Sequence, residues 1–150
     1  MSTRWLPVAL CAALGCAAHK IPGTDIDETA DTDAIIEVVG KYNTAVDAQD
    51  AAGILALVDP SFYDDAGTLT PEDDLDYATL KTKLPSMLAK FQDVRLKITV
   101  KTLNVAGDKA SLVYNYVITF RIGQKVTTDS DIKRMDFKRV NGVWKIVKGV

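Results

Sequence analysis

The sequence predicts an α+β fold in which helices pack on one face of a curved, mainly antiparallel β-sheet. Residues 33–58 place apolar side chains at helical spacing, and residues 94–147 contain four strand-like segments joined by short turns. Helical segments followed by a run of strands, without alternation between them, are typical of this class. The chain of 150 residues accommodates one such domain behind an N-terminal extension.

Residues 1–15 are predicted to be a signal peptide. Arg4 supplies a positive charge ahead of the apolar stretch 5–15, which is far shorter than the ~20 residues that a membrane-spanning helix needs. The run Ala13-Leu14-Gly15-Cys16 resembles the lipobox of bacterial lipoproteins, although leucine is more usual in the place of Ala13. The resemblance implies that Cys16 becomes the lipid-bearing N-terminus of the mature protein. Cleavage of an ordinary signal peptide near Ala17-Ala18 is the alternative.

Residues 16–30 are predicted to form a flexible tether, because proline, glycine, threonine and acidic residues surround two isolated isoleucines. The tether would link the lipid to a folded domain of residues 31–150. The expected location is therefore the bacterial cell envelope, with a membrane contact through the N-terminal lipid. Ala17 lacks the aspartate that marks inner-membrane retention in enteric bacteria, which favours the outer membrane.

Two helices are predicted to open the domain. The first has an apolar face with the spacing i, i+3, i+4, i+7 and i+11. The members of this face are Ile35, Val38, Val39, Tyr42 and Val46. Side chains within 31–33 can cap its first turn by accepting backbone N–H groups. The second helix, 51–58, is expected to stop at Asp59-Pro60, because the residue before a proline avoids helical geometry.

A short strand over 61–63 and a turn after it are expected next. Thr70 then predicts a helix N-cap, with Pro71 at the first helical position. The acidic residues 72–74 favour the positive end of that helix dipole, and this interpretation is preferred over a metal site. Pro85 lies within the same helical pattern and predicts a kink or a break.

Four strands are predicted for the rest of the chain, because apolar and polar residues alternate there. A change of phase at Leu103 and Val105 predicts a β-bulge in the first of these strands. Asn141-Gly142 is a strong signal for a hairpin turn. The strands are expected over 94–105, 109–122, 126–140 and 143–147.

Three stretches in this order carry a resemblance to a known family. They are a helix with an aspartate-bearing turn over 42–50, a second helix ending in Asp59-Pro60, and a strand with acidic residues over 62–65. Together with the strands, they resemble the nuclear transport factor 2-like superfamily, which includes the SnoaL-like polyketide cyclases and ketosteroid isomerase. The resemblance covers about 32–150. It implies a cone with a central pocket between helices and sheet, and homodimers formed through the sheet.

The resemblance to ketosteroid isomerase also implies two catalytic residues. Tyr42 takes the place of the tyrosine that helps to form the oxyanion hole, and Asp65 takes the place of the general base. Because the second helical segment is one residue shorter here, Asp64 is an alternative for the base. A base in an apolar cone can move a proton while a phenol stabilises the enolate. The structural alternatives are a core aromatic at Tyr42 and a solvated turn at Asp64-Asp65.

Three further residues are candidates for the pocket. Lys133 stands where the isomerases carry a protonated aspartate, so it departs from their pattern. Tyr114 and Tyr116 share one strand face with apolar neighbours. Their hydroxyl groups either line the pocket or belong to side chains of the core, and the core is preferred. Trp144 in the last strand is expected to be a core residue.

Charge is divided between the two halves of the domain. Residues 24–80 contain fifteen acidic residues and one lysine, whereas residues 81–150 contain fifteen Lys or Arg and five Asp. Lys133-Arg134 and Lys138-Arg139 are interpreted as part of a solvated, basic outer sheet face. Its excess charge either pairs with acidic residues at the helix edges of the same subunit, which is preferred, or attracts an anionic surface. The net charge of −2 excludes a strongly basic nucleic-acid-binding protein, and the absence of interleaved aromatic residues argues against nucleic acid as a partner.

The composition also limits the chemistry. Cys11, Cys16 and His19 all precede the predicted domain. Triads built on Cys or His, zinc sites of these ligands and disulfides inside the domain are therefore excluded, and no metal or cofactor is expected. The favoured interpretation is an envelope-anchored lipoprotein whose domain binds a small hydrophobic ligand or a protein without catalysis. The alternative is a His-free acid/base isomerase, dehydratase or cyclase acting on a hydrophobic carbonyl compound.

Overall fold

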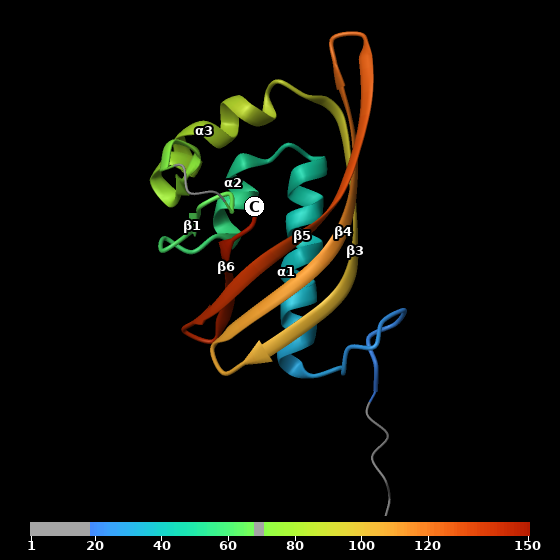
Figure 1. The fold of residues 1–150 in the computed structure, drawn as a ribbon, viewed down its shortest axis with the longest axis vertical. Helices are drawn as coiled ribbons and strands as arrows, with labels where there is room; N and C mark the ends of the chain where they lie inside the picture. Colours follow the sequence, from blue (N-terminus) through green and yellow to red (C-terminus); the bar gives the residue numbers. More distant parts are fainter. Residues whose placement is uncertain (1–18, 68–70) are drawn as a thin grey trace, which may run out of the picture.

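A layer of helices covers one face of a curved antiparallel sheet in the computed structural model, which describes residues 19–67 and 71–150 (Figure 1). The sheet has the strand order β3-β4-β5-β6, and a separate small pair joins β1 to β2. This arrangement confirms the predicted α+β class. The elements are α1 (Ala30–Asp47), α2 (Ala51–Leu57), β1 (Tyr63–Asp64), the 3-10 helix η1 (Pro71–Asp73), β2 (Leu75–Asp76), α3 (Tyr77–Leu88), β3 (Gln92–Ala106), β4 (Lys109–Ile122), β5 (Lys125–Val140) and β6 (Val143–Lys148).

Two sequence predictions fall outside this part of the chain. The signal peptide with Cys16, and the proposed N-cap Thr70, are not among the described residues. Within the described ranges, no helix is long and apolar enough to cross a membrane.

The folded part of the chain begins earlier than predicted. Lys20 and Asp27 form an antiparallel bridge, and their side chains pair at 2.5 Å. Ile26 beside them is only 8 % exposed and shares a groove with Leu103 and Val105 of β3. The C-terminal part of the predicted tether is therefore packed on the sheet, because Ile26 finds an apolar surface there.

Helix α1 begins after the N-cap Thr29, and not after a cap within 31–33. The Thr29 hydroxyl accepts the backbone N–H of Thr32 at 3.1 Å, and the Thr32 hydroxyl accepts that of Thr29 at 2.8 Å. This reciprocal arrangement satisfies two N–H groups, whereas a single cap one turn later satisfies one. The apolar face predicted for this helix is buried at Ile35, Val38, Val39 and Val46.

Helix α2 ends at Leu57, because the next residue leaves helical geometry to join the sheet. Val58 bridges Ile146 of β6 in parallel orientation, and the backbone N–H of Asp59 donates to the Ile146 oxygen at 2.9 Å. These contacts cover the edge of β6, whose backbone groups would otherwise lack partners.

The segment between α2 and α3 differs most from its prediction. The strand expected over 61–63 lies later, at β1. The 3-10 helix η1 is a single turn and not the start of the predicted helix, because the residues after it form β2 and pair with β1. Asp76 then caps α3 by accepting the backbone N–H of Thr79 at 2.7 Å.

Pro85 does not break α3, which continues to Leu88. The side-chain amide of Gln49 donates to the backbone oxygens of Leu88 at 2.6 Å and Phe91 at 2.7 Å, and these bonds satisfy carbonyl groups at the end of the helix. Pro85 has no N–H to donate, so α3 lacks one backbone hydrogen bond in its last turn.

The sheet is close to its prediction. Strand β4 spans the predicted residues, and the other three differ by one or two residues at their ends. The pairing of β3 with β4 shifts between Val100 and Thr102, which confirms the predicted bulge. Asn141 and Gly142 have φ values of +50° and +79°, the left-handed conformation that a type I′ hairpin turn requires.

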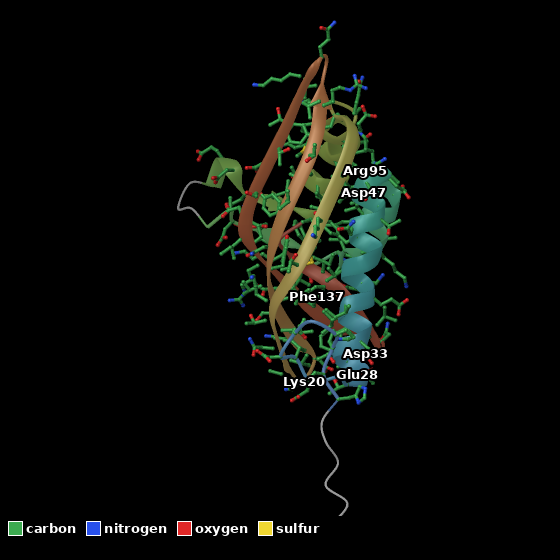
Figure 2. All side chains as sticks on the ribbon, turned by 90° about the vertical axis from the view of Figure 1, so that its right-hand side faces the viewer. Lys20, Glu28, Asp33, Asp47, Arg95 and Phe137 are labelled. Atoms are coloured by element: carbon green, nitrogen blue, oxygen red, sulfur yellow. The ribbon has the colours of Figure 1, made fainter. Side chains whose placement is uncertain are left out.

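One side chain fixes the C-terminal end of α1 to the sheet. Figure 2 shows Asp47 at this end of α1, close to Arg95 of β3. The Asp47 carboxylate accepts the backbone N–H of Leu96 at 2.6 Å. Strand β3 is an edge strand, so such an outward N–H has no partner in the sheet. The bond offsets the unfavourable position of an acidic residue at the negative end of a helix dipole.

We expect Asp47→Ala to lower the free energy of unfolding by about 1–2 kcal/mol, because the N–H of Leu96 loses its acceptor. Asp47→Asn keeps an acceptor oxygen of the same shape, and its loss should be less than half as large. Urea unfolding followed by circular dichroism measures both variants. Equal stability of the alanine variant and the parent would contradict this role for Asp47.

Candidate functional site

A cavity of about 640 Å³ lies between α1, the β1–β2 region and the inner face of the sheet. Its apolar wall includes Val46, Leu75, Leu96 and Ile118. Five of the six residues predicted for the pocket meet here. They are Tyr42, Asp64, Tyr114, Tyr116 and Lys133. Asp65 does not line this cavity.

Tyr42 and Tyr114 present neutral hydroxyl groups to the cavity. Tyr42 projects from α1 one turn before Val46, and Tyr114 lies in β4, where it is 6 % exposed and also part of the core. Burial raises the pKa of both phenols, and the nearby Tyr114 raises the pKa of Tyr42 further. Neither hydroxyl is hydrogen-bonded to another described residue. Both are therefore free to donate to a ligand.

Tyr116 differs from these two tyrosines because its hydroxyl is engaged. It donates to the Asp129 carboxylate at 2.8 Å. This hydrogen bond, with smaller contributions from burial and from the repulsion between carboxylate and phenolate, raises the pKa of Tyr116 to about 12. Tyr116 thus offers the cavity its ring and not a free donor.

The Asp64 carboxylate borders the cavity and is held by backbone groups. One oxygen accepts the N–H of Ala66 and the other accepts the N–H of Gly149, both at 3.0 Å. Because Ala66 follows in the same turn and Gly149 lies just beyond β6, the pair fixes this turn against the end of the sheet.

Asp65 points to a different partner. Its carboxylate pairs with Lys148 at 2.5 Å and accepts the N–H of Gly67 at 3.0 Å. The hydrogen bond from Lys148 and then that from Gly67 lower the pKa of Asp65, since both favour its charged form. Of the two aspartates, Asp64 therefore shares the cavity with Tyr42.

Lys133 lies on the inner face of β5. It is two residues from Met135, which is fully buried, and side chains two apart on a strand point to the same face. Its register partner on β4 is Tyr114. Lys133 is thus a residue of the cavity and not of the predicted outer basic face.

Arg139 also departs from that predicted face. Its guanidinium contacts Asp31 at the start of α1 at 2.6 Å and lies 5.0 Å from the ring centre of Trp144, a buried core residue as expected. Of the four cationic residues predicted for the outer face, only Arg134 and Lys138 lie there. They are sequence neighbours of the buried Met135 and Phe137, and successive side chains of a strand point to opposite faces.

The sequence does not predict Gly149 or Asp73 as residues of the site. Gly149 has φ +87°, and a side chain there would come within 2.2 Å of the Arg134 carbonyl oxygen. A glycine just beyond the last strand is its only sequence signal. Asp73 of η1 borders the cavity, although it was interpreted as dipole compensation. Across 19–67 and 71–150, no three His, Cys, Asp or Glu residues are grouped so that they could hold a metal.

The chain belongs to the SnoaL-like domain family, whose model matches residues 27–149. This agrees with the superfamily that the sequence resembles. The fold is one typical of proteins that bind small ligands and of isomerases and dehydratases. No curated protein matches the chain.

Solved structures with the same fold have little sequence in common with this chain. A nuclear transport factor 2-like protein from Salmonella enterica serovar Typhimurium is 16 % identical, with a TM-score of 0.68 over 80 % of this chain and 90 % of that one. A proposed aromatic ring hydroxylase from Novosphingobium aromaticivorans is 16 % identical, with a TM-score of 0.68 over 81 % of this chain and 89 % of that one. A proposed dehydratase of the nuclear transport factor 2-like family from Streptomyces avermitilis is 14 % identical, with a TM-score of 0.67 over 81 % of this chain and 95 % of that one.

Proposed function

We propose that this chain binds a small, largely apolar molecule that carries an oxygen acceptor, and that it does not transform this molecule. The observation that carries the proposal is the pair of neutral phenols, Tyr42 and Tyr114, beside an aliphatic cavity wall. A volume of about 640 Å³ is within the range of ligand pockets. A protonated phenol in such a pocket donates to a carbonyl or carboxyl oxygen and thereby orients the ligand.

The contacts that already occupy the carboxylates of Asp64 and Asp65 favour ligand binding over catalysis. A general base must reach the proton that it removes. Asp65 does not line the cavity and is paired with Lys148. Both oxygens of Asp64 already accept backbone N–H groups.

A His-free acid/base enzyme is the second candidate, because Asp64 and Tyr42 border the same cavity. Each carboxylate oxygen has a lone pair beyond its single backbone contact, so Asp64 can still accept a proton. In this version Asp64 replaces Asp65 as the base, and Tyr42 stabilises the developing oxyanion. The substrate would be a hydrophobic carbonyl compound.

We also propose that Cys16 carries a lipid and anchors the protein in the cell envelope, with the outer membrane favoured. Figure 1 shows that the described chain starts at the end of the molecule where α1 begins. The cavity is bordered by Tyr42 and Val46, in the second half of α1. An anchor at the N-terminal end would place the cavity in the part of the domain farther from the membrane, within reach of ligands in the surrounding compartment.

Tyr42→Phe is expected to weaken the binding of 2-acetylnaphthalene, an apolar ketone, by about two- to tenfold, because one hydrogen bond is worth ~0.5–1.4 kcal/mol. Binding of naphthalene, which has no acceptor, should not change. Fluorescence titration of the full-length chain carrying Cys16→Ser measures both. Tyr77→Phe, at a tyrosine outside the cavity, is the matched control. Equal effects of the two tyrosine variants, or no binding of either probe, would argue against the proposal.

The enzyme alternative predicts turnover of a Δ5-ketosteroid that falls at least about 100-fold in Asp64→Asn and in Tyr42→Phe, because general acid–base catalysis supplies this much. Asp65→Asn, one residue along, should retain most of the rate. The absorbance of the conjugated product measures each rate. A parent protein without turnover of ketosteroids and related carbonyl compounds rejects this candidate.

Cys16→Ser is expected to move the protein from the membrane fraction to the soluble envelope fraction, because the thiol is the attachment point for the acyl chains. Fractionation of cells expressing the parent and the variant tests this, with Cys11→Ser as the control that should remain in the membrane. Continued membrane association of Cys16→Ser would rule out Cys16 as the anchor.

A further inference from the structure

We infer that the ligand of this cavity is an apolar carboxylate, whose charged group is recognised by Lys133 together with Tyr42 and Tyr114. The inference rests on the proposed binding function and narrows the class of its ligand. It follows from the donors that the fold brings together on the inner face of the sheet.

The three donors are neighbours in space. Lys133 and Tyr114 are register partners on β5 and β4, and directly opposite residues have their Cβ atoms about 5 Å apart. Tyr42 on α1 lines the same cavity as these two residues. Lys133 is exposed and Tyr114 is buried, so these donors form a row that runs from the rim of the cavity toward its interior.

Lys133 also differs in its ion pairing from Lys148 and Arg134, the other two cationic residues that border the cavity. Lys148 pairs with Asp65 at 2.5 Å, and the side chain of Arg134, which is directed to the outer face, pairs with Asp136 at 2.7 Å. Lys133 has no ion pair with any residue in the described ranges. Its ammonium group is therefore the one cation of the described lining whose charge is not matched by a paired carboxylate.

The chemistry of this row fits a carboxylate better than a neutral carbonyl group. An ammonium group has donors and no acceptor, and the two phenols have donors that no described residue uses. A carboxylate is acceptor-only, with two oxygens that can bond to different donors. Its charge-assisted bond to Lys133 is about twice as strong as a neutral one. A ketone uses one donor and leaves the ammonium group without a matching charge.

The experiment compares 2-naphthoate with 2-acetylnaphthalene, which has the same ring system and no charge, on the full-length chain carrying Cys16→Ser. We expect naphthoate to bind about tenfold more tightly at low salt. Lys133→Met should remove this preference while the ketone binds as before, which also shows that the variant is folded. Lys97→Met removes the same charge from the opposite face of the sheet, since Lys97 lies between the inward-facing Leu96 and Ile98. This control should leave the preference intact.

Three results would overturn the inference. Equal or weaker binding of naphthoate in the parent, with the ketone bound through Tyr42, rejects the carboxylate and leaves the binding function standing. An equal loss of preference in Lys97→Met and Lys133→Met shows an effect of net charge and not of the site. Absence of binding by both probes rejects the binding function and the inference with it.

Discussion

The packing of α1 into the hollow of the sheet is the constraint on which the rest of the structure depends. The first half of α1 buries Ile35 and Val38 in the same core cluster as Leu112 of β4 and Met135 of β5. Apolar burial of this kind is the main driving force of folding. The cavity lies farther along the same helix, where Tyr42 takes part in its lining.

The register of β4 and β5 explains how the same two strands contribute first to the buried core and then to the lining of the cavity. Leu112 faces Met135, and both are fully buried. The next inward pair along the two strands is Tyr114 with Lys133, and the two pairs after it set Tyr116 against Asp131 and Ile118 against Asp129. A continuous inner face thus changes from aliphatic to polar over a few residues. The contact of Asp47 with β3 holds the end of α1 over this transition.

The sequence predicted the large elements and the sheet, because long amphipathic patterns report directly on which face is buried. It did not predict β1 and β2, which at two residues each are too short for any periodicity. The resemblance pointed to Tyr42, Lys133 and the pair Asp64-Asp65, and the alternation of β4 pointed to Tyr114 and Tyr116. The choice between Asp64 and Asp65 could not be made in this way, because it depends on a backbone contact with Gly149, 85 residues away in the chain. The pairing of Lys133 with Tyr114 likewise depends on a strand register that composition does not reveal.

The wall of the cavity near Gly149 is made of main chain, and this limits how the protein can diversify. No side chain fits there, because the Arg134 carbonyl oxygen occupies the space that a Cβ atom would need. Substitution of Gly149 therefore cannot enlarge, shrink or recharge the pocket in small steps. Changes in ligand preference among descendants of this protein have to arise at lining positions that carry side chains, such as Tyr42 on α1 and Lys133 on β5. Gly149 is thus a fixed point of the lining, and mutational drift in specificity falls on the side chains around it.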